Sequence, residues 1–136
     1  MGLLSLFKKE KQKTMFYIAG MNYRLDSVKS LLIENSRYKR PSGDRPVYKY
    51  HYFEAPCTLV PEPKNQVDKN AIMIMCNGVH IGYVPADMCK DIKKIIKKCY
   101  ANVIIKGGKY KEYDPDDNEW VVRESEFRGS VTLIEK

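Results

Sequence analysis

Apolar and polar positions are most regular between Leu59 and Val84. The run Ala71–Cys76 is almost continuously apolar, which is typical of a buried strand, and Val79–Val84 repeats that character. Asn77-Gly78 separates the two runs, and this dipeptide favours the two-residue turn of a β-hairpin because both of its residues tolerate positive φ. The stretch therefore predicts a hairpin. Pro61 and Pro63 before it favour the exit from a strand.

Two segments have the apolar spacing of amphipathic helices. Residues 26–35 place Val28, Leu31 and Leu32 on one face, with Asp26 or Ser27 as the expected cap. Residues 87–99 have the clearer stripe, and Asp87 is expected at its N-cap or in its first turn. Five lysines occupy the opposite face of that second helix (Lys90, Lys93, Lys94, Lys97 and Lys98).

The remaining apolar runs are short and separated by turn residues, as in β-rich domains. Thr14–Ala19 predicts a first strand, and Val47–Leu59 a long strand that Pro56 bends. Gly107-Gly108 predicts a tight turn and Asp114–Asn118 a second turn. The fold class expected is therefore mainly β with two helices (α+β), as a small, closed or nearly closed β-barrel of about six strands. The other expected strands are 101–105, a strand from Lys109 onward, 120–123 and 127–134.

Length and charge predict one domain with a basic N-terminal extension. At 136 residues the chain can bury a core, and we expect a flexible basic arm at 1–13 and a single domain at 14–136. No apolar run reaches the roughly 20 residues that span a bilayer. In residues 1–13 the charges follow the short apolar start, which is the wrong order for a signal peptide, so we expect a cytoplasmic protein without membrane contact. Residues 1–53 and 54–110 carry net charges of +7 and +4, whereas residues 111–136 carry −4. This asymmetry favours one face for a polyanion.

The chain has little of the chemistry that an enzyme or a metal site needs. Its four cysteines and two histidines form no CxxC or HxxxH pair, so we expect free thiols and no metal or other cofactor. No nucleophile has a base near it in sequence, and the GGK at 107–109 lacks the P-loop frame. We expect a binding module rather than an enzyme.

The hairpin region resembles the HIRAN domain family. The motif is PEPxNxxDxNAI followed by the hairpin and IGYVP, and residues 16–23 (FYIAGMNY) are similar to the opening strand of the family. The resemblance, to a stand-alone member of bacterial or phage type, implies an OB-like β-barrel that binds the 3′ end of single-stranded DNA. The positions that carry the match are Asn65, Asp68, Asn70, Ala71, Ile72, Gly82, Tyr83 and Pro85.

The same resemblance assigns roles to individual residues. Asp68 matches the carboxylate that accepts a hydrogen bond from the terminal 3′-hydroxyl, and Asn65 a contact to the backbone of the end nucleotide. Tyr23 matches an aromatic on which a base stacks. Lys69 would supply charge, and Tyr83 lies near the site. The chain departs from the family at Val67, where well-studied members have an aromatic, and at Asn22, where they have a basic residue.

Other candidate contacts come from the residues themselves, and each has a structural alternative. The loop that contains Arg37, Lys39 and Arg40 interleaves basic residues with Tyr38, as phosphate contacts require, but a solvated loop has the same composition. Lys93, Lys94 and Lys97 would face phosphates or only solvent. Asn65, Asp68 and Asn70 would alternatively tie the backbone of their own loop.

Three tyrosines alternate along residues 48–52 and would fall on one face of a strand. They favour rings that cover the barrel core, and the alternative is a platform on which bases stack. The function expected is a DNA-binding module for single-stranded 3′-hydroxyl ends in replication or repair, with a helicase or nuclease acting in trans. The alternative is a protein-interaction barrel that docks a partner through a sheet edge or the N-terminal arm.

Overall fold

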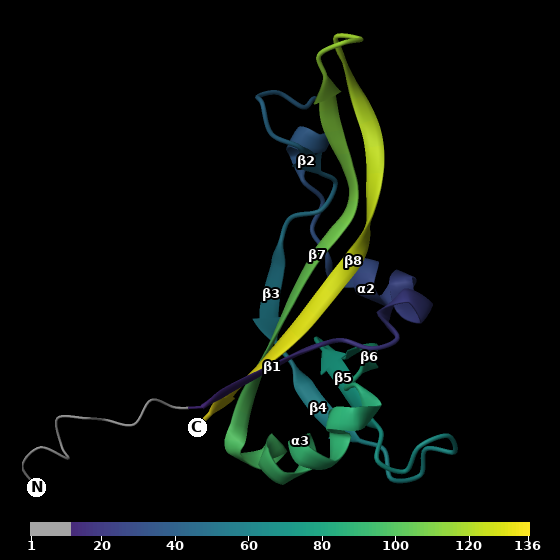
Figure 1. Cartoon of the computed structure of the whole chain (residues 1–136), viewed down its shortest axis with the longest axis vertical. Helices are drawn as coiled ribbons and strands as arrows, with labels where there is room; N and C mark the ends of the chain where they lie inside the picture. The colour runs from purple at the N-terminus through teal and green to yellow at the C-terminus, as the bar shows by residue number, and fades with distance from the viewer. Residues whose placement is uncertain (1–11) are drawn as a thin grey trace, which may run out of the picture.

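The computed structural model describes residues 12–136, so the basic arm expected at 1–13 lies almost wholly outside the described residues. Within residues 12–136 the chain forms a five-stranded sheet and a three-stranded sheet (Figure 1). In the larger sheet β7 and β8 pair with each other, β8 also pairs with β1, and β7 also pairs with β2 and β3. The smaller sheet has the order β4-β5-β6. All pairs are antiparallel. The strands are β1 (Lys13–Tyr17), β2 (Val47–Tyr48), β3 (Phe53–Pro56), β4 (Thr58–Pro61), β5 (Ile72–Cys76), β6 (Val79–Tyr83), β7 (Cys99–Asp114) and β8 (Glu119–Glu135).

The small sheet contains the hairpin expected from the sequence. β5 and β6 are joined at Asn77 (φ 49°) and Gly78 (φ 78°), the positive angles of a two-residue hairpin turn. Ile72, Ile74 and Ile81 are completely buried, as the apolar runs predict. β4 ends at Pro61, which confirms the predicted strand exit.

β7 and β8 form one long hairpin, whereas the sequence predicted four shorter strands. Gly107-Gly108 is not a turn: β7 runs through it, and the register with β8 shifts between Lys106 and Gly108. The two glycines form a bulge, because β8 continues to pair on both sides of them. The strands expected at 120–123 and 127–134 are likewise one strand. The chain reverses only after Asp114, which confirms the turn expected at 114–118.

The expected strand at 47–59 is divided between the two sheets. β2 and β3 both pair with β7, but residues 49–52 between them leave the ladder. The chain changes sheets at Pro56, where β3 ends two residues before β4 begins. Pro56 therefore marks the bend that the sequence predicted.

The fold class expected from the sequence is confirmed: the domain is mainly β with two α-helices. Its likeness to an OB barrel is approximate, because among the described residues the two sheets are not closed into one ladder. They are linked by an isolated bridge, in which the backbones of Ala19 and Tyr83 exchange two hydrogen bonds of 2.9 Å. The domain has eight strands, against the expectation of about six: the predicted 47–59 strand is divided into three, whereas the four strands predicted after residue 100 are merged into two.

α2 (Leu25–Leu31) is shorter than the helix expected over residues 26–35. The Asn35 N–H donates to the Lys49 carbonyl and the His51 N–H to the Ile33 carbonyl, so residues 33–35 lie beside another segment instead of continuing the helix. α3 (Cys89–Ile95) is extended by 3₁₀ turns η3 (Ala86–Met88) and η4 (Ile96–Lys98) to the predicted length. Neither α-helix has a side-chain cap, so the cap expected at Asp26 or Ser27 is wrong, whereas Asp87 lies in the first turn of η3, one of the two places expected for it. Two further 3₁₀ turns are η1 (Met21–Arg24) and η2 (Ser36–Tyr38).

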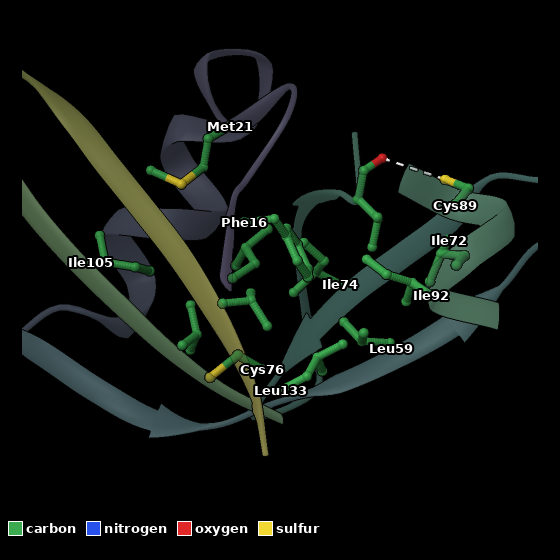
Figure 2. Close-up of a cluster of buried hydrophobic side chains, with 14 of the residues drawn as sticks. Phe16, Met21, Leu59, Ile72, Ile74, Cys76, Cys89, Ile92, Ile105 and Leu133 are labelled. Carbon is green, nitrogen blue, oxygen red and sulfur yellow. Dashed lines mark hydrogen bonds between the residues drawn. The ribbon is translucent and has the colours of Figure 1, made fainter. Parts of the chain in front are cut away.

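The core lies where β1, the small sheet and α3 meet one end of the β7–β8 hairpin, the end that contains Val103 and Val131 (Figure 2). Ile92 brings the apolar stripe of α3 into it, as predicted. All four cysteines are free thiols, and Cys76 and Cys89 are buried in this core. Cys89 Sγ donates to the Val84 carbonyl at 3.7 Å, so the thiol of α3 is anchored to the end of β6. Within residues 12–136 no helix has the length and apolarity to cross a membrane.

Candidate nucleic-acid interface

The loop between β4 and β5 holds Asp68 through a set of short hydrogen bonds. Asn65 Oδ1 accepts from the backbone N–H groups of Val67 and Asp68, both at 2.9 Å. Asn65 Nδ2 donates to Glu62 Oε1 at 3.2 Å. Asn65 therefore ties the backbone of its own loop, as the structural alternative predicted, because its oxygen already has two partners.

Of the two carboxylate oxygens of Asp68, one accepts a hydrogen bond from the loop backbone and the other does not. Oδ1 accepts from the Asn70 N–H at 2.9 Å, and Oδ2 has no hydrogen-bond partner among the described residues. The residue as a whole is partly exposed. An ionised carboxylate can only accept hydrogen bonds, which suits it to a hydroxyl donor. Lys69, the next residue, is exposed. Val67, the residue before Asp68, is also exposed, and it offers no aromatic ring at that position.

Lys93 connects this loop to α3. Its Nζ donates to Asn70 Oδ1 at 3.2 Å and reaches the Lys69 carbonyl at 3.5 Å. Lys93 therefore supports the loop instead of projecting freely with the other lysines of the helix. Lys94 and Lys97 are exposed and remain candidates for phosphate contacts.

Tyr23 lies in η1 and is 93% exposed. An aromatic ring so open to solvent has little packing role, and it is available for stacking. Asn22, also exposed, lines a shallow cavity of about 350 Å³ together with Tyr23. Asn22 also lines a second cavity of about 370 Å³, which lies between η1 and β8.

Tyr83 links η1 to the Asp68 loop, which gives the predicted site residue a structural role. The guanidinium of Arg24 lies 5.7 Å from the centre of the Tyr83 ring, and His80 meets that ring edge-on at 4.8 Å. Burial raises the pKa of Tyr83, and the Glu62 carboxylate adds to the rise. Glu62 in turn holds Asn65, so Arg24 of η1 is linked through Tyr83, Glu62 and Asn65 to the Asp68 loop.

The surroundings of His80 favour its neutral form. Burial lowers the pKa of His80, and the positive charge of Arg24 lowers it further, while the Gly82 carbonyl opposes the shift. His80 Nε2 lies 2.9 Å from that carbonyl oxygen. The positive charge of this part of the site is therefore carried by Arg24.

The predicted basic loop lies elsewhere. Arg37, Lys39 and Arg40 are exposed, but they lie beside β2 at one end of the molecule, whereas the Asp68 loop lies beside α3 at the other (Figure 1). Arg37 Nη2 donates to the Ser42 carbonyl at 3.1 Å and thereby closes its own loop. Lys39 lines a separate cavity of about 560 Å³ with Lys49 and Lys111. The structure does not bring these three residues to Asp68.

The three alternating tyrosines do not cover the core, contrary to the interpretation that their spacing favours. Tyr48 and Tyr52 are 39% and 58% exposed, and with Tyr50 they form one wall of a cavity of about 660 Å³. Lys106, Arg128 and Glu126 are among the residues that complete it. We call this cavity the tyrosine groove. The only feature of the sequence that pointed to the tyrosine groove is the alternation of tyrosine with lysine and histidine. Alternation alone does not determine which face of a strand is buried.

Among residues 12–136 no three His, Cys, Asp or Glu side chains lie close enough together to hold a metal ion. The candidate interface therefore consists of an acceptor carboxylate, exposed aromatics and basic side chains.

Comparisons with known proteins identify the family. The HIRAN domain model matches residues 12–124, which include the whole Asp68 loop and η1. The crystal structure of the HIRAN domain of human HLTF aligns with 96% of this chain and 84% of its own, with 15% identity and a TM-score of 0.44. No curated protein matches. The chain belongs to the HIRAN domain family, which is known in general as a family of DNA-binding modules.

Proposed function

We propose that this domain binds single-stranded DNA and holds the free 3′-hydroxyl end at Asp68. The observation that carries the proposal is the Asp68 carboxylate itself. One of its oxygens is fixed by the loop, the other has no partner among the described residues, and the residue is partly exposed. A carboxylate held in this way accepts a hydrogen bond from a terminal hydroxyl and repels a terminal phosphate.

The surroundings of Asp68 supply the other contacts that a strand end needs. The Tyr23 ring offers a surface for stacking of a terminal base. Exposed Lys69 and Lys94 supply positive charge for the phosphates upstream of the end. Asn65 orders the loop, so the acceptor is placed before the ligand arrives and little conformational entropy is lost on binding.

The proposed role is that of a binding module, not of an enzyme. Free 3′ ends arise during replication and repair, and a module that holds them would deliver such ends to a helicase or nuclease acting in trans. The requirement for a terminal hydroxyl would direct that partner to ends that can be extended.

The test compares three strands of the same sequence: one with a free 3′-hydroxyl, one with a 3′-phosphate and one closed into a circle. We expect the hydroxyl-ended strand to bind most tightly. One hydrogen bond to a charged acceptor is worth about 1.5–3 kcal/mol, which is roughly a tenfold to hundredfold difference in dissociation constant. Fluorescence anisotropy at several salt concentrations measures the dissociation constant of each strand.

Asp68→Asn is the matching variant, because its amide oxygen still accepts from the Asn70 N–H while the charge is lost. It should remove the preference for the hydroxyl end. Asp114→Asn is the control: Asp114 Oδ1 makes the same kind of bond, to the Asp116 N–H at 3.0 Å, but it lies at the tip of the β7–β8 hairpin. Equal binding of all three strands by the folded wild type would refute end recognition. No binding even at low salt would favour the protein-interaction alternative.

A further inference from the structure

The tyrosine groove has the composition of a surface that binds single strands. Tyr48 and Tyr52 present their rings to it, and Lys106 and Arg128 stand across from them on β7 and β8. Aromatic rings with basic side chains beside them suit unpaired bases joined by phosphates, because each base has a face that stacks and each phosphate has a charge.

The two basic residues are placed against each other at a cost to the fold. Lys106 and Arg128 are direct cross-strand partners, and like charges in that arrangement destabilise a sheet. Neither makes an ion pair; within residues 12–136 the only ion pair joins Arg123 to Glu112. Glu126 also lines the groove, yet it does not pair with either of them. An anionic ligand would relieve this repulsion.

The bulge at Gly107-Gly108 shapes the groove. A Cβ on Gly107 would lie 2.3 Å from the Glu126 carbonyl oxygen, and one on Gly108 would lie 2.8 Å from the Phe127 ring. The Phe127 ring therefore packs directly on the backbone of β7, and Tyr50 leans on Phe127 with a ring separation of 6.1 Å. The wall of the groove is thus fixed to the core through Tyr50, while Tyr48 and Tyr52 remain exposed.

The groove and the Tyr23 cavity each share lining residues with a third cavity. Glu126 and Arg128 line both the tyrosine groove and the cavity between η1 and β8. Asn22 lines that second cavity and also the cavity that contains Tyr23. The cavity beside η1 and β8 therefore shares lining residues both with the Tyr23 cavity and with the tyrosine groove.

We propose that the tyrosine groove is a second nucleic-acid subsite, which stacks bases of the strand upstream of the end held at Asp68. This inference rests on the proposed function, because Asp68 and Tyr23 set where the strand begins. Tyr48 and Tyr52 stack the bases, and Lys106 and Arg128 contact phosphates. The acidic tip of the hairpin, with Asp114, Asp116 and Asp117, repels the strand and confines it to the groove.

The experiment compares free-hydroxyl oligothymidylates of about three and about twelve nucleotides, lengths below and within the range of a single-strand site. The wild type should bind the longer strand more tightly. Tyr48→Leu with Tyr52→Leu should weaken binding of the longer strand by about tenfold or more and leave the shorter strand unaffected. Tyr113→Leu with Tyr100→Leu, two comparably exposed tyrosines outside the groove, should change neither.

A second variant separates binding from folding. Lys106→Gln with Arg128→Gln removes the repulsion between strands, so its melting temperature should hold or rise. Its affinity for the longer strand should fall, and the slope of log affinity against log salt should decrease by about 0.7 for each phosphate that the variant no longer neutralises. Photocrosslinking of 5-iodouracil placed upstream of the end should label Tyr48 or Tyr52.

The results distinguish this subsite from the end site. Unchanged binding of the longer strand by the tyrosine variant, with the hydroxyl preference intact, overturns the groove and leaves the proposed function standing. Tyrosine-dependent binding of circular strands without any end preference supports the groove and overturns the Asp68 end site.

Discussion

The two ends of the β7–β8 hairpin are built differently. Below Gly107 the strands carry Val103, Ile105, Val131 and Leu133, all essentially inaccessible to solvent, and the core packs against them. Beyond Gly108, residues 109–124 include no buried residue. We call this second part the outer hairpin.

The outer hairpin is held by pairs on its surface. The rings of Tyr113 and Trp120 meet at 5.6 Å, and Lys111 lies 4.5 Å from the centre of the Tyr38 ring. Such surface pairs contribute about 0.2–1 kcal/mol each, whereas burial of one large side chain contributes about 1.5–3 kcal/mol. The core end therefore supplies stability. The outer hairpin, which contributes little to stability, is free to present charge and aromatic rings beside the groove.

The largest effect should come from the core end. Ile74→Ala removes a completely buried side chain from β5, and we expect a loss of about 2–5 kcal/mol in the free energy of unfolding because a cavity remains. Val122→Ala in the outer hairpin is the control, since Val122 is more than half exposed, and it should change stability by less than about 0.5 kcal/mol. Urea denaturation measures both. Equal losses would show that the outer hairpin shares the core.

The contrast between the two ends also separates what the sequence predicts from what it does not. The β5–β6 hairpin is predictable because the apolar runs and Asn77-Gly78 are local signals that agree. Gly107-Gly108 carries the same kind of local signal but forms a bulge, because pairing with β8 continues on both sides of it. Whether Gly107-Gly108 forms a turn or a bulge depends on pairing with β8, which lies further along the chain, so the local sequence pattern does not determine it.

The candidate site divides in the same way. The hydrogen bonds of Asn65 and Asp68 follow from ordinary turn chemistry, and the position of Asp68 as an acceptor came from the family motif. That Arg24, Glu62 and His80 surround Tyr83 depends on the bridge between Ala19 and Tyr83, which brings η1 to β6. The end of α2 at Leu31 likewise depends on backbone pairing with residues 49 and 51.

The bulge that divides the two ends should show an intermediate effect. In Gly107→Ala the new methyl group would overlap the Glu126 carbonyl at 2.3 Å, and the residue must keep a φ of 112°. We expect a loss of about 1–3 kcal/mol in the free energy of unfolding from the forced shift of β8. Gly43→Ala is the control: it also has a positive φ of 91°, but its surroundings are open, so it lacks the steric part. Equal effects of the two substitutions would mean that β8 yields freely at the bulge.

The smallest effect is expected within the outer hairpin itself. Arg123 Nε lies 2.8 Å from Glu112 Oε2, and both side chains are about half exposed. An exposed pair of this kind contributes about 0.2–1 kcal/mol, and salt screens it. A double-mutant cycle with Arg123→Gln and Glu112→Gln should therefore give a coupling within that range at low salt, and almost none in about 1 M salt, where the screening length is about 3 Å. A coupling above about 2 kcal/mol that persists in high salt would mean that the outer hairpin contains a desolvated interaction. The outer hairpin would then have a stabilising centre of its own, which would contradict the contrast between it and the core end.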